Sequence, residues 1–392
     1  MYSTLVCAGK FFVMMRERAF PRGTGLLKAG VLSLTALLCA TTSALALPEH
    51  DKTAAGSLSV AQSGKTMTID QHSGRAIAEW TSFNIEADES VTVHQPSEKA
   101  ILLNRVLDDD PSRISGRLSA NGQVWLMNGA GVLFAEGAEV NVGGLIASTA
   151  DIENSAFMNG EYRFGEPGQP GAAIINSGTI SAGDGPVGFF ASHVSNRGTL
   201  RAAAGSVVLG ATETQTLDFY GDGLLHVALD PLETGSASGS AYKAENSGAI
   251  YAPAGTVEMS VAQGNAVIER MIAQTGAVSV DSAGYDAAGN VVLGGGSTAT
   301  TTVSGSISAD SHGAGRSGGA IEIQGRHIEI ADTARISADG NGSLTAPPLP
   351  EAKPETRGTN GGGTIRIGGE YLGSGGMPRA QTTRIAEGAR IT

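Results

Sequence analysis

An internal repeat constrains the fold of this 392-residue chain more than any other feature. The repeated unit is Asn or Asp, any residue, Gly or Ala, any residue, an apolar residue, any residue and Ala. Most copies start 20 to 29 residues apart, and two gaps of 50 and 55 residues indicate insertions. Repeats of this length predict a solenoid in which each unit packs on its neighbours. The copies, some of them looser, are residues 176–182, 196–202, 246–252, 274–278, 303–309, 332–338 and 387–391.

A second unit follows most copies after a Gly-rich gap, and in it apolar and polar residues alternate. This period of two is typical of a strand with one buried face, and the Gly that opens each unit suits a tight corner. Two short strands per coil predict an all-β parallel β-helix whose Ile and Val side chains stack inside. A β-sandwich is the alternative fold, which the regular spacing disfavours. The second units are residues 205–209, 255–259, 289–293, 319–323 and 363–367.

The two longer gaps contain different insertions. Residues 217–227 alternate around Gly221-Asp222-Gly223, which predicts an extra-helical hairpin. Residues 344–360 are rich in Pro, Thr and Gly and predict a solvated loop.

Residues 1–46 have the features of an extended Sec signal peptide. A basic run precedes an apolar stretch over residues 29–40, which is too short to span about 30 Å of hydrocarbon. Ala44 and Ala46 are the expected cleavage residues. Both cysteines of the chain, Cys7 and Cys39, lie in this segment, so the mature protein is expected to be exported through the Sec translocon without a disulfide.

Composition and motifs exclude several classes of function. The net charge of -12 disfavours nucleic acid as a partner, because phosphate binding needs a basic face. The seven histidines form no i,i+4 pair, and we predict no metal, no cofactor and no catalytic residue. A β-helix polysaccharide lyase or glycosidase is the alternative function, but the outward residues Glu258, Glu322 and Arg366 form a mixed stripe that we interpret as a solubility feature.

Residues 76–152 carry motifs that resemble a known family. They include Trp80-Thr-Ser-Phe83, Leu103-Asn104-Arg105-Val106, Asn128-Gly129-Ala130-Gly131 and Val140-Asn141-Val142-Gly143-Gly144. This stretch is similar to the secretion domain of two-partner-secretion exoproteins, the filamentous haemagglutinin N-terminal family, and within it to the high-molecular-weight adhesin type. Residues 362–389 resemble the stretch that follows that domain.

The resemblance implies a right-handed parallel β-helix with an N-terminal cap and extra-helical strands. It divides the chain into the signal at 1–46, the secretion domain at 47–300 and continuing β-helix repeats at 301–392, which we expect to be truncated within a repeat. It also implies a non-enzymatic adhesin or haemagglutinin-like protein, secreted through the periplasm to the surface or medium of a Gram-negative bacterium. Its expected partners are the periplasmic domains of an outer-membrane β-barrel transporter and, through a missing C-terminal region, a host-cell receptor or glycan.

The family signature at 128–131 is Asn-Pro-Asn-Gly, and this chain retains only its first Asn and its final Gly. Without the fixed φ of proline, the turn is less pre-set. We expect Asn128 and Asn141 to bond to backbone at corners and Gly143-Gly144 to allow a close turn; the alternative is that each of these residues only shapes the fold. An unpaired strand edge in the first coils is a second possible contact with the transporter. The candidate recognition residues are Asn104, Asn128, Gly129, Ala130, Gly131, Asn141, Gly143 and Gly144.

Overall fold

The computed structural model describes most of the chain after residue 46. The described residues are 47–203, 205–219, 225–230, 242–263, 270–282, 288–313, 316–341, 361–369 and 376–392. The expected cleavage residues Ala44 and Ala46 and the loop expected at 344–360 lie outside them. Among the described residues, no helix is both long and apolar enough to cross a membrane.

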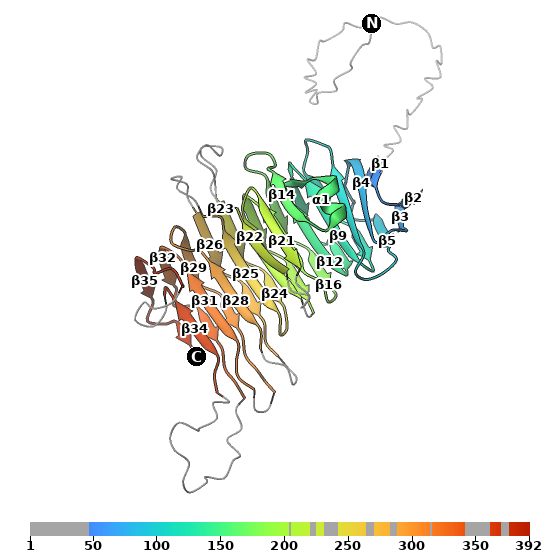
Figure 1. Cartoon of the computed structure of the whole chain (residues 1–392). Helices are drawn as coiled ribbons and strands as arrows, with labels where there is room; N and C mark the ends of the chain where they lie inside the picture. Colours follow the sequence, from blue (N-terminus) through green and yellow to red (C-terminus); the bar gives the residue numbers. More distant parts are fainter. Residues whose placement is uncertain are drawn as a thin grey trace, which may run out of the picture. The chain divides into compact units, whose positions relative to one another are not determined.

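The described chain winds into a parallel β-helix (Figure 1). Each full turn supplies one strand to each of three sheets, which we name A, B and C. Within the described residues, sheet A runs in the order β1 (Glu49–Ala55), β4 (Arg75–Ser82), β6 (Ile101–Val106), β9 (Gln123–Asn128), β12 (Gly144–Ser148), β17 (Val187–Ala191), β20 (Ser206–Ala211), β25 (Thr256–Val261), β28 (Asn290–Gly294), β31 (Ala320–Gln324) and β34 (Thr364–Ile367).

Sheet B contains the apolar position of the first repeated unit. In the part of the chain that is described, its order is β2 (Leu58–Ser63), β3 (Thr66–Gln71), β5 (Ser90–His94), β8 (Arg117–Ala120), β11 (Glu139–Val142), β16 (Thr179–Ala182), β19 (Thr199–Ala202), β24 (Ala249–Tyr251), β27 (Ala277–Ser279), β30 (Ser306–Ser308), β33 (Arg335–Ser337) and β36 (Arg390–Ile391).

Sheet C is the side of the coil that the repeats did not predict. Its described strands, in spatial order, are β7 (Ser112–Ile114), β10 (Gly131–Phe134), β15 (Ala173–Asn176), β18 (His193–Asn196), β23 (Tyr242–Asn246), β26 (Arg270–Gln274), β29 (Thr300–Val303), β32 (His327–Ile330) and β35 (Thr382–Ile385). The prediction of two strands per coil was therefore incomplete, because a full turn has three. The strands of sheets A and B confirm the predicted pair.

Stacked apolar side chains form the inner core. In sheet A, Val207, Val257, Val291 and Ile321 pair in register from coil to coil, and each is fully buried. Each such side chain contributes roughly 1.5–3 kcal/mol when fully buried. The predicted inward stacking of Val and Ile is therefore confirmed.

Buried amides form a second stack inside the coil. The side-chain nitrogen of Asn176 donates to Asn196 Oδ1 at 2.8 Å, Asn196 to Asn246 Oδ1 at 2.7 Å, and Asn246 to Gln274 Oε1 at 2.9 Å. All four side chains are fully buried. We name this stack the amide ladder. It satisfies polar groups that would be costly to bury unpaired.

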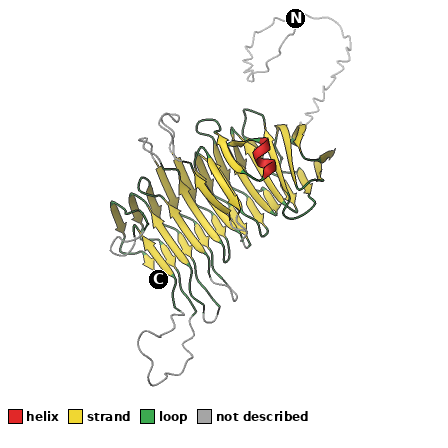
Figure 2. Cartoon of the chain, viewed as in Figure 1, coloured by secondary structure: helices red, strands yellow, loops and turns green. Residues whose placement is uncertain are grey.

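An extra-helical layer covers the outer face of the first strands of sheet A. It consists of α1 (Asn154–Asn159) and a fourth sheet, D, in the order β13 (Asp151–Ile152), β14 (Tyr162–Glu166), β21 (Gln215–Phe219) and β22 (Leu225–Leu229). Figures 1 and 2 show α1 and β14 lying over sheet A. The antiparallel pair β21 and β22 confirms the hairpin expected at 217–227.

The extra-helical layer creates an outer hydrophobic core. Trp125 is fully buried and packs edge-on against Phe157 and Tyr162, with ring centroids 5.5 Å and 4.7 Å away. Ile77 and Phe190, which point outward from sheet A, belong to the same cluster. The early strands of sheet A are therefore apolar on both faces, as strands covered on both sides must be.

Two antiparallel elements form an N-terminal cap. Strand β1 pairs antiparallel with β4, and its pairing contains three register shifts. Strand β2 pairs antiparallel with β3, whereas β3 pairs parallel with β5. Register shifts and antiparallel strands interrupt the parallel pattern, so this end does not offer a regular edge for further coils.

Candidate functional site

Three loops meet at the corner where strands of sheet A end. They are residues 107–111 after β6, residues 129–130 between β9 and β10, and residues 167–172 after β14. We call this region the corner site. The backbone N–H of Gln169 donates to Gly129 O at 2.7 Å, which joins the third loop to the second.

Asn128 fastens the corner site from inside. Its side-chain nitrogen donates to Asp110 O and to Ser112 Oγ, both at 3.0 Å, and its Oδ1 accepts the backbone N–H of Ala130 at 2.8 Å. The predicted bond to backbone at a corner is present. Because Asn128 is only 1% exposed, its role here is to hold the loops in place.

The other three residues of the motif differ in what they tolerate. Gly131 has φ +116°, and a Cβ there would lie 2.6 Å from Ala173 O, so only glycine fits. Gly129 has no such restriction, since an added Cβ would meet Gly168 Cα at 3.8 Å. Ala130 is buried. The loss of the family's proline at 129 therefore leaves the turn intact.

The corner site encloses a recess of about 450 Å³. Leu107, 53% exposed, stands at its edge and is the most exposed of the large apolar side chains in the described part of the chain. Four carboxylates and one guanidinium are the charged groups of its lining, contributed by Asp108, Asp109, Asp151, Glu166 and Arg105. The recess thus combines an apolar side chain with an excess of negative charge.

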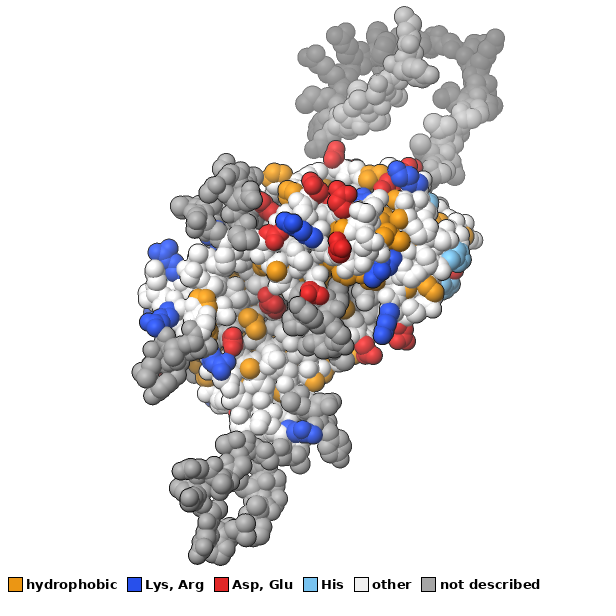
Figure 3. All heavy atoms as spheres, viewed as in Figure 1, with side chains coloured by type: hydrophobic (Ala, Val, Ile, Leu, Met, Phe, Trp, Pro, Cys, Tyr) orange, Lys and Arg blue, Asp and Glu red, His pale blue; other side chains and the backbone are white. Residues whose placement is uncertain are grey.

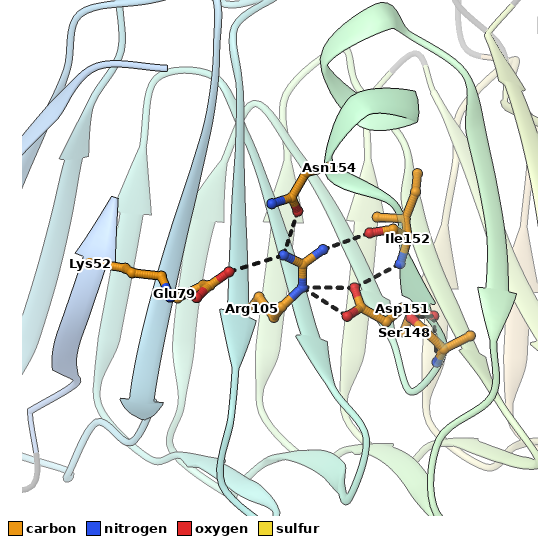
Figure 4. A network of polar contacts seen from close by, with 8 residues as sticks. Lys52, Glu79, Arg105, Ser148, Asp151, Ile152 and Asn154 are labelled. Atoms are coloured by element: carbon orange, nitrogen blue, oxygen red, sulfur yellow. Dashed lines mark hydrogen bonds and ion pairs between the residues drawn. The ribbon is translucent and has the colours of Figure 1, made fainter. Parts of the chain in front are cut away.

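Arg105 organises the inner side of this recess (Figure 4). Its Nε contacts both carboxylate oxygens of Asp151, at 2.8 and 2.9 Å. Its terminal nitrogens donate to Ile152 O and to Asn154 Oδ1, both at 2.6 Å, and to Glu79 Oε1 at 3.4 Å. The guanidinium therefore ties β4, β6, β13 and α1 together.

Lys52 of β1 extends the Arg105 network to the N-terminal cap. Its Nζ lies 2.9 Å from Glu79 Oε2. Figure 4 shows the side chains of Lys52 and Glu79 beside Arg105. The hydrogen bond with Glu79 raises the pKa of Lys52 above its ordinary value. Sequence reasoning missed this network, although an Arg in a mainly apolar strand such as β6 is a signal for a partly buried charge that needs partners.

Asn104 lies inside the coil rather than at the corner site. Its Oδ1 accepts the indole N–H of Trp80 at 3.1 Å, and its side-chain nitrogen donates to Trp125 O at 3.2 Å. It is 1% exposed. Asn104 therefore satisfies a buried tryptophan and is out of reach of any partner of the folded domain.

Gly143 and Gly144 lie at a different corner, where sheet B leads into sheet A, and Asn141 precedes this corner. The expectation that Asn141 bonds to backbone at a corner was wrong. Asn141 lies inside β11, and because Val140 and Val142 point inward, the strand alternation turns its side chain to the solvent.

Gly143 occupies a crowded column, as expected for a close turn. A Cβ at Gly143 would lie 2.8 Å from Gly122 O, and one at Gly185 would lie 2.2 Å from Gly143 O. Backbone bonds run through the column, with Gly143 N donating to Gly122 O at 2.7 Å. Gly144 is less restricted, with its nearest neighbours at 3.2 Å. The column continues through Gly205, Gly255, Gly289, Gly319 and Gly363.

The stripe of charged residues expected on sheet A is present but half-buried. Glu258 aligns with Val292, Glu322 and Arg366 on successive strands. Arg366 Nη1 donates to Glu322 Oε1 at 2.8 Å. Figure 3 shows acidic and basic side chains interspersed over the face drawn there.

Known proteins share this architecture. The crystal structure of the HMW1 secretion domain from Haemophilus influenzae superposes with a TM-score of 0.71 and 26% sequence identity, over 87% of this chain and 82% of that chain. The heme/hemopexin-binding protein of Haemophilus influenzae is 39% identical over 142 residues, which are 35% of this chain and 15% of that protein. Its counterpart from strain KW20 Rd is 39% identical over 130 residues, 32% of this chain and 14% of that protein. The chain thus spans about 15% of the length of these curated relatives.

The capped parallel β-helix with its extra-helical layer places the molecule in the class of secretion domains. The match also confirms the right-handed coil that the sequence motifs implied. The family model of the TPS secretion domain, where TPS denotes two-partner secretion, matches residues 46–296. The chain belongs to this family. Domains of this family belong to exoproteins that a partner transporter exports across the outer membrane of Gram-negative bacteria, and this chain contains such a secretion domain.

Proposed function

We propose that this chain is the export-directing part of an adhesin or haemagglutinin-like exoprotein, and that its transporter binds the corner site. The route runs through the Sec translocon, with cleavage after the signal at 1–46, and then through the periplasm. We assign contact with a host-cell receptor or glycan to a part of the exoprotein outside residues 46–296, which the family model matches. The heme/hemopexin-binding proteins are much longer than this chain, and we assign neither heme nor hemopexin to it as a ligand.

One observation carries the choice of the corner site. Leu107 is exposed beside a recess, although the buried side chain of Asn128 and the partly buried side chain of Arg105 hold the surrounding loops in place. A recess with fixed walls, an apolar side chain and a charged rim offers a protein partner both apolar area to cover and charge to complement. The transporter surface is expected to offer an apolar recess for Leu107 and basic side chains for Asp108 and Asp109.

A non-catalytic role is part of the proposal. The outward carboxylate of Glu322 is paired with Arg366, and Glu258 lies two strands away from it in register. Paired carboxylates facing one sugar are what the lyase or glycosidase alternative requires. The stripe on sheet A contains a salt bridge between Glu322 and Arg366 instead of two paired carboxylates.

A secretion assay tests the proposal. The full chain is expressed with and without its partner transporter, and the periplasm and the medium are compared by immunoblot. The protein is expected in the medium only when the transporter is present. Release without the transporter would contradict the proposal and would direct attention to polysaccharide cleavage.

Leu107→Ser separates recognition from folding. Leu107 is exposed, so its replacement leaves the fold unchanged, and a severalfold loss of secreted protein is expected. Tyr251→Ser is the matched control, since Tyr251 is 39% exposed on a distant strand of sheet B. Equal secretion of the Leu107→Ser variant and the parent chain would exclude the corner site as the contact.

A further inference from the structure

A second recess lies at the other corner, where strands of sheet B lead into sheet A. Its depth follows from unequal connection lengths. Six residues connect β5 to β6 and four connect β16 to β17, but only two connect β8 to β9 and one connects β11 to β12. The two short connections form a floor between two longer ones. The resulting groove has a volume of about 950 Å³.

A smaller apolar notch continues the groove along the coil. The notch has a volume of about 560 Å³ and shares Ser181 and Ala182 with the groove. Tyr251 is its exposed aromatic ring, and the guanidinium of Arg201 lies 5.4 Å from the centre of that ring. Pro253 and Ala202 complete an apolar surface beside it. Such a surface suits the apolar face of a sugar ring.

The groove itself is polar and nearly balanced in charge. Two basic residues, Arg75 and Lys99, and two acidic residues, Glu98 and Asp184, line it. Arg75 is already engaged, with Nε 3.1 Å from the hydroxyl of Tyr162. A ligand for this lining must therefore supply both hydrogen-bond donors and acceptors without a large net charge.

Two amides on the floor differ in their availability. The side chain of Asn121 is already hydrogen-bonded to the backbone of Gln95. Its Oδ1 accepts the N–H of Gln95 at 2.7 Å, and its Nδ2 donates to Gln95 O at 2.8 Å. Asn141 projects from β11 into the groove and is exposed. Its amide can donate and accept at once, which matches the hydroxyl groups of a sugar.

The backbone of the floor is not free to add a peptide strand. Gly143 N donates to Gly122 O, Gly183 N to Val142 O and Gly185 N to Gly143 O, at 2.7 to 3.0 Å. Strand addition needs an unpaired edge, so side chains must carry recognition here. The groove also crosses successive coils, which lie about 4.8 Å apart, a spacing close to the length of one sugar unit in an extended chain.

We propose that the groove and the notch bind an extended neutral oligosaccharide, with hydroxyl groups at Asn141 and Asp184 and one ring stacked on Tyr251. This activity is independent of the export proposed above, because the corner site and the groove share no lining residue.

Titration calorimetry on the purified mature chain tests this proposal with chitohexaose, cellohexaose and mannohexaose as probes. At least one of them is expected to bind. Tyr251→Ala and Asn141→Ala are each expected to weaken that binding about tenfold, which corresponds to about 1.4 kcal/mol. Tyr251→Phe retains the ring and should bind like the parent chain.

Glu139→Ala is the matched control for Asn141→Ala, because Glu139 also points outward from β11 but does not line the groove. It should leave the affinity unchanged. Circular dichroism confirms that each variant is folded. The proposal is overturned if none of the three hexasaccharides binds, if a heparin hexasaccharide or an extended peptide binds in their place, or if Tyr251→Ala leaves the affinity unaltered.

Discussion

Gly129 and Gly131 lie two residues apart in one turn, yet they respond to different constraints. Gly131 needs its positive φ and its lack of a side chain, whereas Gly129 has room around it. Asn128, which precedes Gly129, ends a strand and is extended. Extended backbone is also the conformation preferred before a proline.

Gly129→Pro is therefore expected to stabilise the domain by about 0.4–1 kcal/mol, because it restricts the unfolded chain without straining the folded one. Denaturant unfolding measures the change. Gly131→Ala in the same turn should destabilise the domain, and a loss of stability in Gly129→Pro would show that the turn differs from the one described.

Arg105→Met is expected to reduce the free energy of unfolding by on the order of 3 kcal/mol, because it leaves Ile152 O and Asn154 Oδ1 without a donor and Asp151 without its cation, whereas Glu79 keeps Lys52. Arg117→Met is the control. Arg117 also pairs with a carboxylate, Glu139 at 2.9 Å, but both side chains are more than half exposed. That pair should contribute at most about 1 kcal/mol. Similar losses in the two variants would contradict the structural role of the Arg105 network.

At the scale of the element, the amide ladder links successive strands of sheet C by side-chain hydrogen bonds. Asn196 accepts from Asn176 and donates to Asn246, so its removal leaves groups unpaired on both sides. Each buried unpaired group costs about 1–3 kcal/mol.

Asn196→Leu is accordingly expected to destabilise the coil by about 2–6 kcal/mol if both neighbours lose their partner. Asn196→Gln should be much milder, since Gln274 fills the equivalent position two strands along the ladder. Thermal unfolding of the two variants compares them directly. A Leu variant as stable as the parent would mean that the ladder contributes no net stability.

The ladder also shows why the sequence predicted two strands of each coil and missed the third. Strands of sheets A and B place apolar residues inward at every second position, as in Val257 and Met259. Strand β18 places Val194 and Asn196 inward, so its inward positions are only half apolar. Periodicity detects apolar faces, and a face made partly of amides escapes it.

The corner site was only partly predictable for a related reason. The turn at 128–131 is local and can be seen in four residues. The Arg105 network joins residues 26 to 49 positions apart, and only the folded coil brings them together. The outward face of Trp125 could be expected to be buried, but no local pattern indicates that α1 covers it.

At the scale of the whole domain, the two cores have different extents. The inner core runs through all described coils, whereas the outer core ends at Val208 of β20. Beyond it, outward positions of sheet A become polar, as at Glu258 and Glu322. The early coils are held on two faces and the later coils on one.

Hydrogen exchange followed by mass spectrometry should therefore show slower exchange in β6, β9 and β12 than in β28 and β31. Peptides from sheet B provide the internal control, because the extra-helical layer does not cover them. Uniform exchange along sheet A would mean that the outer core adds no local stability.

Because of the cap, new coils can be added at only one end of the β-helix. One end is closed by the irregular strand β1 and the hairpin of β2 and β3, so new layers have a single growth front. Each layer contacts mainly the one delivered just before it, and the search for partners stays short. A polypeptide that leaves a pore with its amino end first would present its segments in the order in which this front can accept them. The pace of assembly would then be set by the supply of chain.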